Sequence, residues 1–212
     1  MIKRAEALVP LGRTEEVTRD VAAARIGFGE MGDRKRLCRA KLLLSRAYER
    51  AGDLTRVEEE ASEASRIAAE AGDEEFVARA QAAVAEAYER KAQYAEALSH
   101  AEEARGRFEK LAAVLHPEVL KGALAGVSLT IARVHADRGA AAEARAAIDA
   151  AVTLARAARD LTALAGALEL SARLLRTEGD LAHALMAHEE ALTISESRSD
   201  RIASAALWMG LG

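Results

Sequence analysis

The 212-residue chain is poor in three kinds of residue: it has one cysteine, two prolines and 3% aromatic residues. The single cysteine, Cys38, excludes an internal disulfide and a zinc site built from several cysteines. Because proline is scarce while alanine, leucine, glutamate and arginine are abundant, the composition favours helices. Small side chains suit close helix packing but bury little apolar area each, so we expect stability to rest on many contacts between neighbours.

Charge and hydropathy narrow the range of partners. The net charge of −4 gives no overall attraction to nucleic acid or to an anionic membrane. The basic cluster at residues 34–41 lacks the interleaved aromatic residues that stack on bases. No stretch approaches the roughly 20 apolar residues that span a bilayer, and Glu6 interrupts the apolar run 5–11, which disfavours a secretory signal. We expect a cytoplasmic protein with no nucleic-acid or membrane partner.

Two kinds of residue recur with one spacing. Gly12, Gly52, Gly139 and Gly179 follow one another at steps of 40, 87 and 40 residues, and Ala92 stands at the missing position. A second ladder, of aspartates, has the same steps: Asp33, Asp73, Asp160 and Asp200. Both ladders therefore indicate a period of 40 residues with a single long step of 47. A fixed period in this range is typical of a solenoid of stacked units.

Each period is expected to hold two antiparallel helices. After Asp73, apolar residues recur at steps of three and four, as on one buried helical stripe: Val77, Ala80, Val84, Ala87 and Tyr88. After residues 91–93 a second stripe follows: Leu98, Ala101, Ala104, Phe108 and Leu111. Glycine at the inner turn of each pair can take the left-handed conformation that ends a helix, and aspartate at the outer turn can cap the next helix.

The long step places seven extra residues between Phe108 and Leu120. Seven residues are about two helical turns, so one extra turn on each helix of the pair would preserve both buried faces. His116-Pro117 is the predicted corner, because proline suits the first position of a helix. We expect a protruding loop near residues 112–117; the alternative is a tolerated insertion without a role.

Large, turn and small residues share fixed places in the first two full repeats: Tyr48, Gly52, Ala61 and Ala64, then Tyr88, Ala97, Ala101 and Ala104. With a 40-residue period, this pattern resembles the tetratricopeptide repeat in its longer-period variant. Later copies depart from it, since His135 and Leu175 replace the tyrosines and His188 takes an apolar place. The resemblance implies an all-α fold, an α-α superhelix of antiparallel helix pairs.

The predicted domain organisation is a single array over residues 1–212. It consists of a partial repeat 1–32, repeats 33–72, 73–119, 120–159 and 160–199, and a partial repeat 200–212 whose Trp208-Met209-Gly210-Leu211 matches the W-x-x-L-G opening of such a repeat through Gly212. Both ends therefore fall within repeats, so we expect a segment of a larger protein; the alternative is that these units are natural caps. Exposed terminal faces would favour a homodimer.

The resemblance implies a concave groove lined by the first helix of each pair, which binds peptides, partner domains or small ligands. The first helices, at 34–50, 74–91, 118–138 and 161–178, hold 15 Lys and Arg against 9 Asp and Glu. The second helices, at 53–71, 93–115, 140–159 and 180–197, hold 8 against 16. The groove is therefore expected to be more basic than the outer face.

The candidate ligand-binding residues lie on these first helices. Arg46, Glu86, Arg133 and Arg173 are equivalent under the period, and the other candidates are Arg39, Arg50, Arg79, Arg90 and Arg176. Arginine grips carboxylates in bidentate fashion, so an acidic peptide is the expected ligand. The alternative is that these charges only solvate the surface and pair with their neighbours.

Metal, cofactor and catalytic sites are not indicated. His183 and His188 are five residues apart and so face different sides of a helix. No phosphate-binding or nucleophile-elbow motif occurs, and Gly27, Gly29 and Gly32 fit a glycine-rich loop poorly because no strand precedes them. We expect a non-enzymatic protein-interaction module without cofactor or metal. The alternative is a regulatory sensor of a bacterial signalling or transcription-regulating protein that binds a small ligand or signalling peptide.

Overall fold

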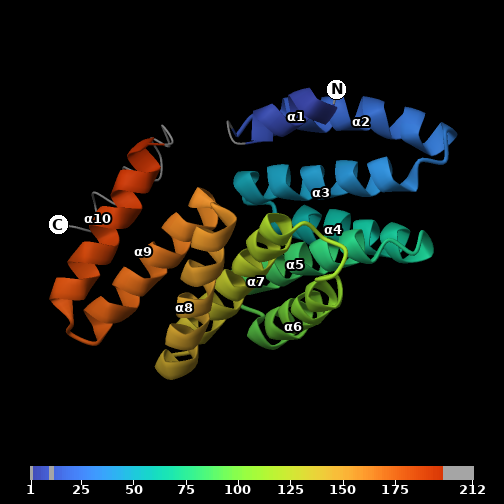
Figure 1. Cartoon of the computed structure of the whole chain (residues 1–212). Coiled ribbons are helices and arrows are strands. Elements are labelled where there is room, and N and C mark those ends of the chain that lie inside the picture. The colour runs from blue at the N-terminus through green and yellow to red at the C-terminus, as the bar shows by residue number, and fades with distance from the viewer. Residues whose placement is uncertain (1, 10–11, 198–212) are drawn as a thin grey trace. The chain divides into compact units, whose positions relative to one another are not determined.

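The computed structural model describes residues 2–9 and 12–197, and the regular structure among them is helical (Figure 1). Contacts divide the chain into two compact units, Met1–Leu111 and Ala112–Gly212. Each unit is a stack of antiparallel helices in which every helix packs against its neighbours in sequence. The predicted all-α fold, of the α-α superhelix type built from antiparallel helix pairs, is confirmed.

In the part of the first unit that the structure describes, one short helix is followed by five long ones: α1 (Ile2–Leu8), α2 (Thr14–Glu30), α3 (Arg34–Ala51), α4 (Leu54–Glu70), α5 (Glu74–Arg90) and α6 (Tyr94–Lys110). The second unit contains, among its described residues, α7 (Pro117–Asp137), α8 (Ala141–Ala158), α9 (Leu161–Thr177) and α10 (Leu181–Ser197). Odd-numbered helices are the first members of the predicted pairs. The opening repeat match at Trp208 lies outside the described residues.

The first helices form a layer of their own within each unit. Besides its sequence neighbours, α3 contacts α5, and α7 contacts α9, more extensively than α4 contacts α6 or α8 contacts α10. Gly166 on α9 permits the close approach to α7, because a Cβ there would lie 3.1 Å from Leu129 Cδ2. We call the odd-numbered helices of each unit its first-helix layer.

The inner turns have the predicted chemistry. Gly12, Gly52, Gly139 and Gly179 have φ between +67° and +85°, in the left-handed region. Ala92, at the position where the ladder lacks its glycine, also has a positive φ of 57°. A residue with a Cβ therefore takes the same strained conformation, which shows that packing of the helix pair dictates this turn.

The outer turns are capped as predicted and contain a further ladder. Asp33, Asp73 and Asp160 each accept hydrogen bonds from backbone N–H groups in the first turn of the next helix. The residue before each aspartate has a positive φ: Gly32, Gly72 and Arg159. The sequence did not reveal this second left-handed position, because Arg159 stands where Gly32 and Gly72 stand in the earlier repeats.

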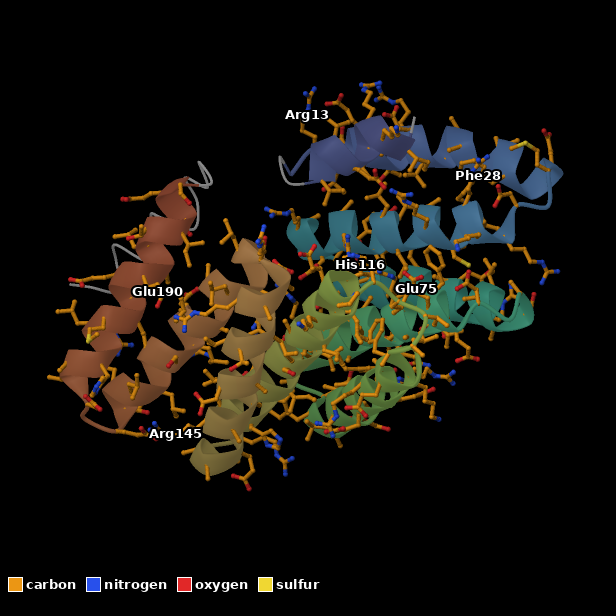
Figure 2. All side chains as sticks on the ribbon, in the orientation of Figure 1. Arg13, Phe28, Glu75, His116, Arg145 and Glu190 are labelled. Atoms are coloured by element: carbon orange, nitrogen blue, oxygen red, sulfur yellow. The ribbon has the colours of Figure 1, made fainter. Side chains whose placement is uncertain are left out.

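The long step is distributed differently from the prediction. Helix α6 has 17 residues, the same length as α4, so it gains no extra turn. Helix α7 has 21 residues, four more than α5, and the remaining three lengthen the connection, residues 111–116. Pro117 occupies the first turn of α7, as predicted. His116, labelled in Figure 2, precedes this helix. Helix α7 thus starts at Pro117, three residues before the predicted repeat boundary at 120.

Small side chains dominate the core. The predicted stripe is buried at Val77, Ala80, Val84 and Ala87 on α5, and at Ala101, Ala104 and Phe108 on α6. Its other members, Tyr88, Leu98 and Leu111, are half-buried. In the second unit, Leu129, Ala132, Ile148, Ala151, Ala167 and Leu170 form one cluster. Alanine where two helices cross lets their axes approach closely. The apolar area that larger side chains would bury is therefore buried here by contacts between many neighbouring turns.

Helix α7 is long and apolar enough to cross a membrane by length and composition alone, which the sequence analysis did not expect. The same properties are found in core helices of proteins that lie outside membranes. Within its unit, α7 packs along α8 and α9, and residues from Ala125 to Val134 are largely buried. The apolar surface of α7 therefore serves the core of the second unit.

Replacing glycine by alanine should have opposite effects on stability at an inner turn and inside a helix. Gly52→Ala should destabilise the protein by about 1 kcal/mol, because a Cβ at φ +77° is strained although no atom lies within 4 Å of it. Gly106→Ala, inside α6 and equally free of contacts, should stabilise it by about 0.5–1 kcal/mol. Ala92→Gly should be stabilising for the converse reason. Urea unfolding of the three variants measures these changes; a neutral Gly52→Ala would contradict the strained turn.

Candidate functional site

All nine candidate residues lie on first helices. Six belong to the first unit: Arg39, Arg46 and Arg50 on α3, and Arg79, Glu86 and Arg90 on α5. Three belong to the second unit: Arg133 on α7, and Arg173 and Arg176 on α9. The residues of each unit share one layer because α3 contacts α5 and α7 contacts α9. Whether they form a ligand site stays a prediction.

Three arginines of the first unit are already engaged in ion pairs. Arg90 Nη2 lies 2.7 Å from Glu49 Oε1, which links α5 to α3. Arg79 Nε donates to Glu75 one turn earlier at 2.9 Å. Arg39 Nε donates to Glu6 Oε1 of α1 at 2.8 Å. Arg90 and Arg39 therefore join helices, whereas Arg79 pairs within α5.

Arg46 and Arg50 differ from these three. Both are exposed on α3, and neither has a carboxylate of a described residue within ion-pair distance. They are four residues apart, so they lie one turn apart on the same side of the helix. This pair is the positively charged feature of the first unit best placed to meet an external carboxylate.

The three candidate arginines of the second unit also have few ion-pair partners. Arg133 Nη2 lies 3.7 Å from the point where a Cβ of Gly166 would stand, so the arginine lies against α9. Arg173 reaches Asp137 only at the limit of an ion pair, 4.0 Å. Arg133 and Arg176 have no ion pair with a described residue.

Some carboxylates of the second helices pair with neighbouring helices. Glu60 Oε2 accepts from Lys41 at 3.0 Å in a largely buried pair. Glu190 accepts from Arg156 through both oxygens. Part of the uneven charge found in the sequence therefore serves helix pairing, as the alternative hypothesis proposed.

One spacing recurs among these pairs. Partners 33 residues apart are found four times: Glu6 with Arg39, Glu58 with Lys91, Glu74 with Arg107, and Arg145 with Glu178. The second and fourth pairs are equivalent under the repeat period but have opposite polarity. Opposite charges at this spacing are the sequence signal that would have identified the ion pairs.

A polar cluster joins α4, α5 and α6 at Glu58. Tyr88 donates its hydroxyl to Glu58 Oε1 at 2.9 Å, and Lys91 donates to Oε2. The ring of His100 stacks on Tyr88 with centroids 5.3 Å apart, and its Nδ1 lies 2.6 Å from Gln81 Oε1. The hydrogen bond from Lys91 lowers the pKa of Glu58, and the hydrogen bond to Glu58 raises the pKa of Tyr88. The cluster is part-buried and joins neighbouring repeats.

A pocket of about 560 Å³ lies between α1, α2 and α3, and the sequence analysis did not identify it. Its apolar wall includes Ile2, Ala23, Phe28 and Met31, and its charged lining residues are all basic: Lys3, Arg36 and Arg39. Phe28 lies on α2 and packs against the core formed with α3 (Figure 2). Gly27, considered in the sequence for a phosphate loop, is a helical residue that lines this pocket.

Chemistry-bearing side chains elsewhere have structural roles. Burial raises the pKa of the Cys38 thiol to about 11, and its Sγ donates to the carbonyl of Ala64. Among residues 2–9 and 12–197, no group of three or more His, Cys, Asp or Glu side chains is placed to hold a metal ion. That the chain has no enzymatic activity stays a prediction.

Comparison with known proteins gives the fold without a family. No protein-family profile matches the chain, and no curated protein matches it. Among solved structures, it is similar to BtubC (BKLC) from P. vanneervenii, with 16% sequence identity and a TM-score of 0.61 over 93% of this chain and 91% of that one. The likeness supports a helical repeat fold, and the assignment to the tetratricopeptide family stays a prediction.

The Glu58 cluster predicts a pH-dependent contribution to stability. Because its pKa is lowered in the folded protein, ionised Glu58 stabilises the fold above the unfolded value of about 4.3, and this contribution disappears as pH falls through the lower folded value. Glu58→Gln should destabilise the protein by about 1 kcal/mol at pH 7. The difference between the two proteins should shrink below pH 4, as measured by urea unfolding across pH. A difference independent of pH would show that the ionised carboxylate is unimportant.

Proposed function

We propose that this chain is a non-catalytic protein-interaction module whose first-helix layers bind an acidic peptide or domain. The observation that carries the proposal is the set of exposed or half-exposed arginines without an ion pair to a described residue: Arg46 and Arg50 in the first unit, and Arg133 and Arg176 in the second. Arg39 and Arg90 are held in helix-to-helix pairs and Arg79 in a pair within α5, whereas these four candidates have no such partner among the described residues.

The chemistry of the guanidinium group sets the ligand class. Its planar array of N–H donors matches the two oxygens of a carboxylate, and Arg46 and Arg50 repeat that array one turn apart. An exposed ion pair contributes only about 0.2–1 kcal/mol, so one arginine does not hold a ligand. A peptide with several carboxylates, bound with strong dependence on salt, fits this surface.

The likeness to BtubC supports the repeat architecture and not the partner, because one fold serves many functions. Stacked helix pairs present an extended surface with few deep cavities, which suits recognition of a chain better than a reaction on a small substrate. The acidic ligand is therefore argued from the arginines themselves.

Charge reversal on the first-helix layer tests the proposal. We expect Arg46→Glu/Arg50→Glu to weaken binding of a fluorescently labelled peptide of alternating glutamate and leucine at least tenfold, measured by anisotropy at low salt. Arg25→Glu/Arg105→Glu, which changes net charge equally on the second helices α2 and α6, should leave binding within about twofold. Equal losses of peptide affinity in both variants would show that only the overall charge matters. Unchanged affinity in both would show that Arg46 and Arg50 do not bind the peptide.

The alternative is a regulatory sensor in which the same surface binds a small ligand or signalling peptide. One measurement separates the two hypotheses. Thermal unfolding with increasing peptide should show a rise in the melting temperature for any ligand that binds the folded form. A small ligand that raises it more than acidic peptides do would favour the sensor.

A further inference from the structure

One carboxylate stands among the candidate arginines of the first unit. Glu49 lies on α3, one turn after Arg46 and directly before Arg50. Its Oε1 accepts a hydrogen bond from Arg90 Nη2 of α5 at 2.7 Å, so the pair joins two helices of the first-helix layer. Glu49 therefore occupies a guanidinium group on the helix that neighbours Arg46 and Arg50.

The preceding repeat shows the same position without the carboxylate. Arg50 and Arg90 are equivalent under the 40-residue period, and the residue equivalent to Glu49 is Val9. Val9 is buried in the core that α1 forms with α2 and α3, and its side chain has no acceptor atom. Arg50 has no ion pair with a described residue, whereas Arg90, one repeat later, has one. The exchange of valine for glutamate accounts for this difference.

The pair of Glu49 and Arg90 is open to exchange. The side chain of Arg90 is 44% exposed and that of Glu49 is 24% exposed, so a ligand can reach the guanidinium group. An exposed ion pair changes an equilibrium constant by no more than about fivefold. A peptide that Arg46 and Arg50 already hold has a high effective concentration near Arg90. A further carboxylate of that peptide can therefore take the place of Glu49.

We propose that Glu49 is an internal competitor of the ligand: its carboxylate holds Arg90 in the free protein, and a carboxylate of the bound peptide replaces it. This inference rests on the proposed function, because it concerns the same surface and the same class of ligand. Binding exchanges one ion pair at Arg90 for another, so a ligand with a single carboxylate gains little there. Glu49 thus lowers the affinity for acidic ligands and favours those with several carboxylates.

Removal of the competitor tests the proposal directly. Glu49→Gln and the wild type are titrated with the labelled glutamate–leucine peptide at low salt and followed by anisotropy. We expect the variant to bind at least threefold more tightly, because Arg90 then meets the ligand without losing an ionic partner. Glu59→Gln removes the same charge from an exposed position of α4 that has no ion pair with a described residue. This control should change the affinity less than twofold.

A double-mutant cycle identifies Arg90 as the group that Glu49 withholds. Arg90→Gln should cost at least threefold more affinity in the Glu49→Gln protein than in the wild type, where the arginine is already paired. Equal costs in the two backgrounds would overturn the proposal. Thermal unfolding without peptide separates competition from a structural role, since Glu49→Gln should tighten binding without raising the melting temperature. Weaker binding together with a lower melting temperature would make the pair purely structural.

The outcomes also distinguish this inference from the proposed function. If Arg46→Glu/Arg50→Glu loses the peptide while Glu49→Gln binds it as the wild type does, the competitor is excluded and the proposed function stands. Equal tightening by Glu49→Gln and Glu59→Gln would also exclude the competitor, because only the overall charge would then matter. If neither the wild type nor Glu49→Gln binds the peptide, both proposals are wrong.

Discussion

The structure depends on one constraint: a single helix pair of this composition cannot bury its apolar stripe alone, so each helix uses its neighbours in sequence. With alanine at most crossings, the free energy of burial per residue is small and must be collected over many turns. Close approach of the helices makes this effective, as at Gly166, where α7 and α9 leave little room for a Cβ. Stability is then close to a sum over repeats and their interfaces.

Close packing also explains where the charges lie. Small side chains bring helix surfaces near enough for long charged side chains to reach across, and Glu58 with Lys91 and Arg145 with Glu178 do so at equivalent places. Their reversed polarity shows that either helix can carry the carboxylate of such a pair. Arg46, Arg50, Arg133 and Arg176 have no ion pair with a described residue, and the proposed binding role rests on them.

The turns and stripes of the fold were predictable from the sequence because they depend on local chemistry. A left-handed residue at the inner turn and an aspartate cap at the outer turn follow from a few adjacent residues, and Gly52 and Asp73 behave as their positions indicated. The long step was predicted only in part. Its seven extra residues were assigned equally to two helices, whereas α7 takes four and the connection takes three, because the helix period alone does not say where a helix stops.

The sequence by itself determined the helix pairs, their turns and the concentration of arginine on the first helices, since each depends on periodicity or on residues close in the chain. Only the tertiary structure decided which arginines are already paired and that a basic-rimmed apolar pocket lies beside α1. Both depend on side chains from different helices meeting in space, as Glu6 meets Arg39 across 33 residues. The period places such residues on neighbouring helices, but packing distance and side-chain direction decide whether they touch.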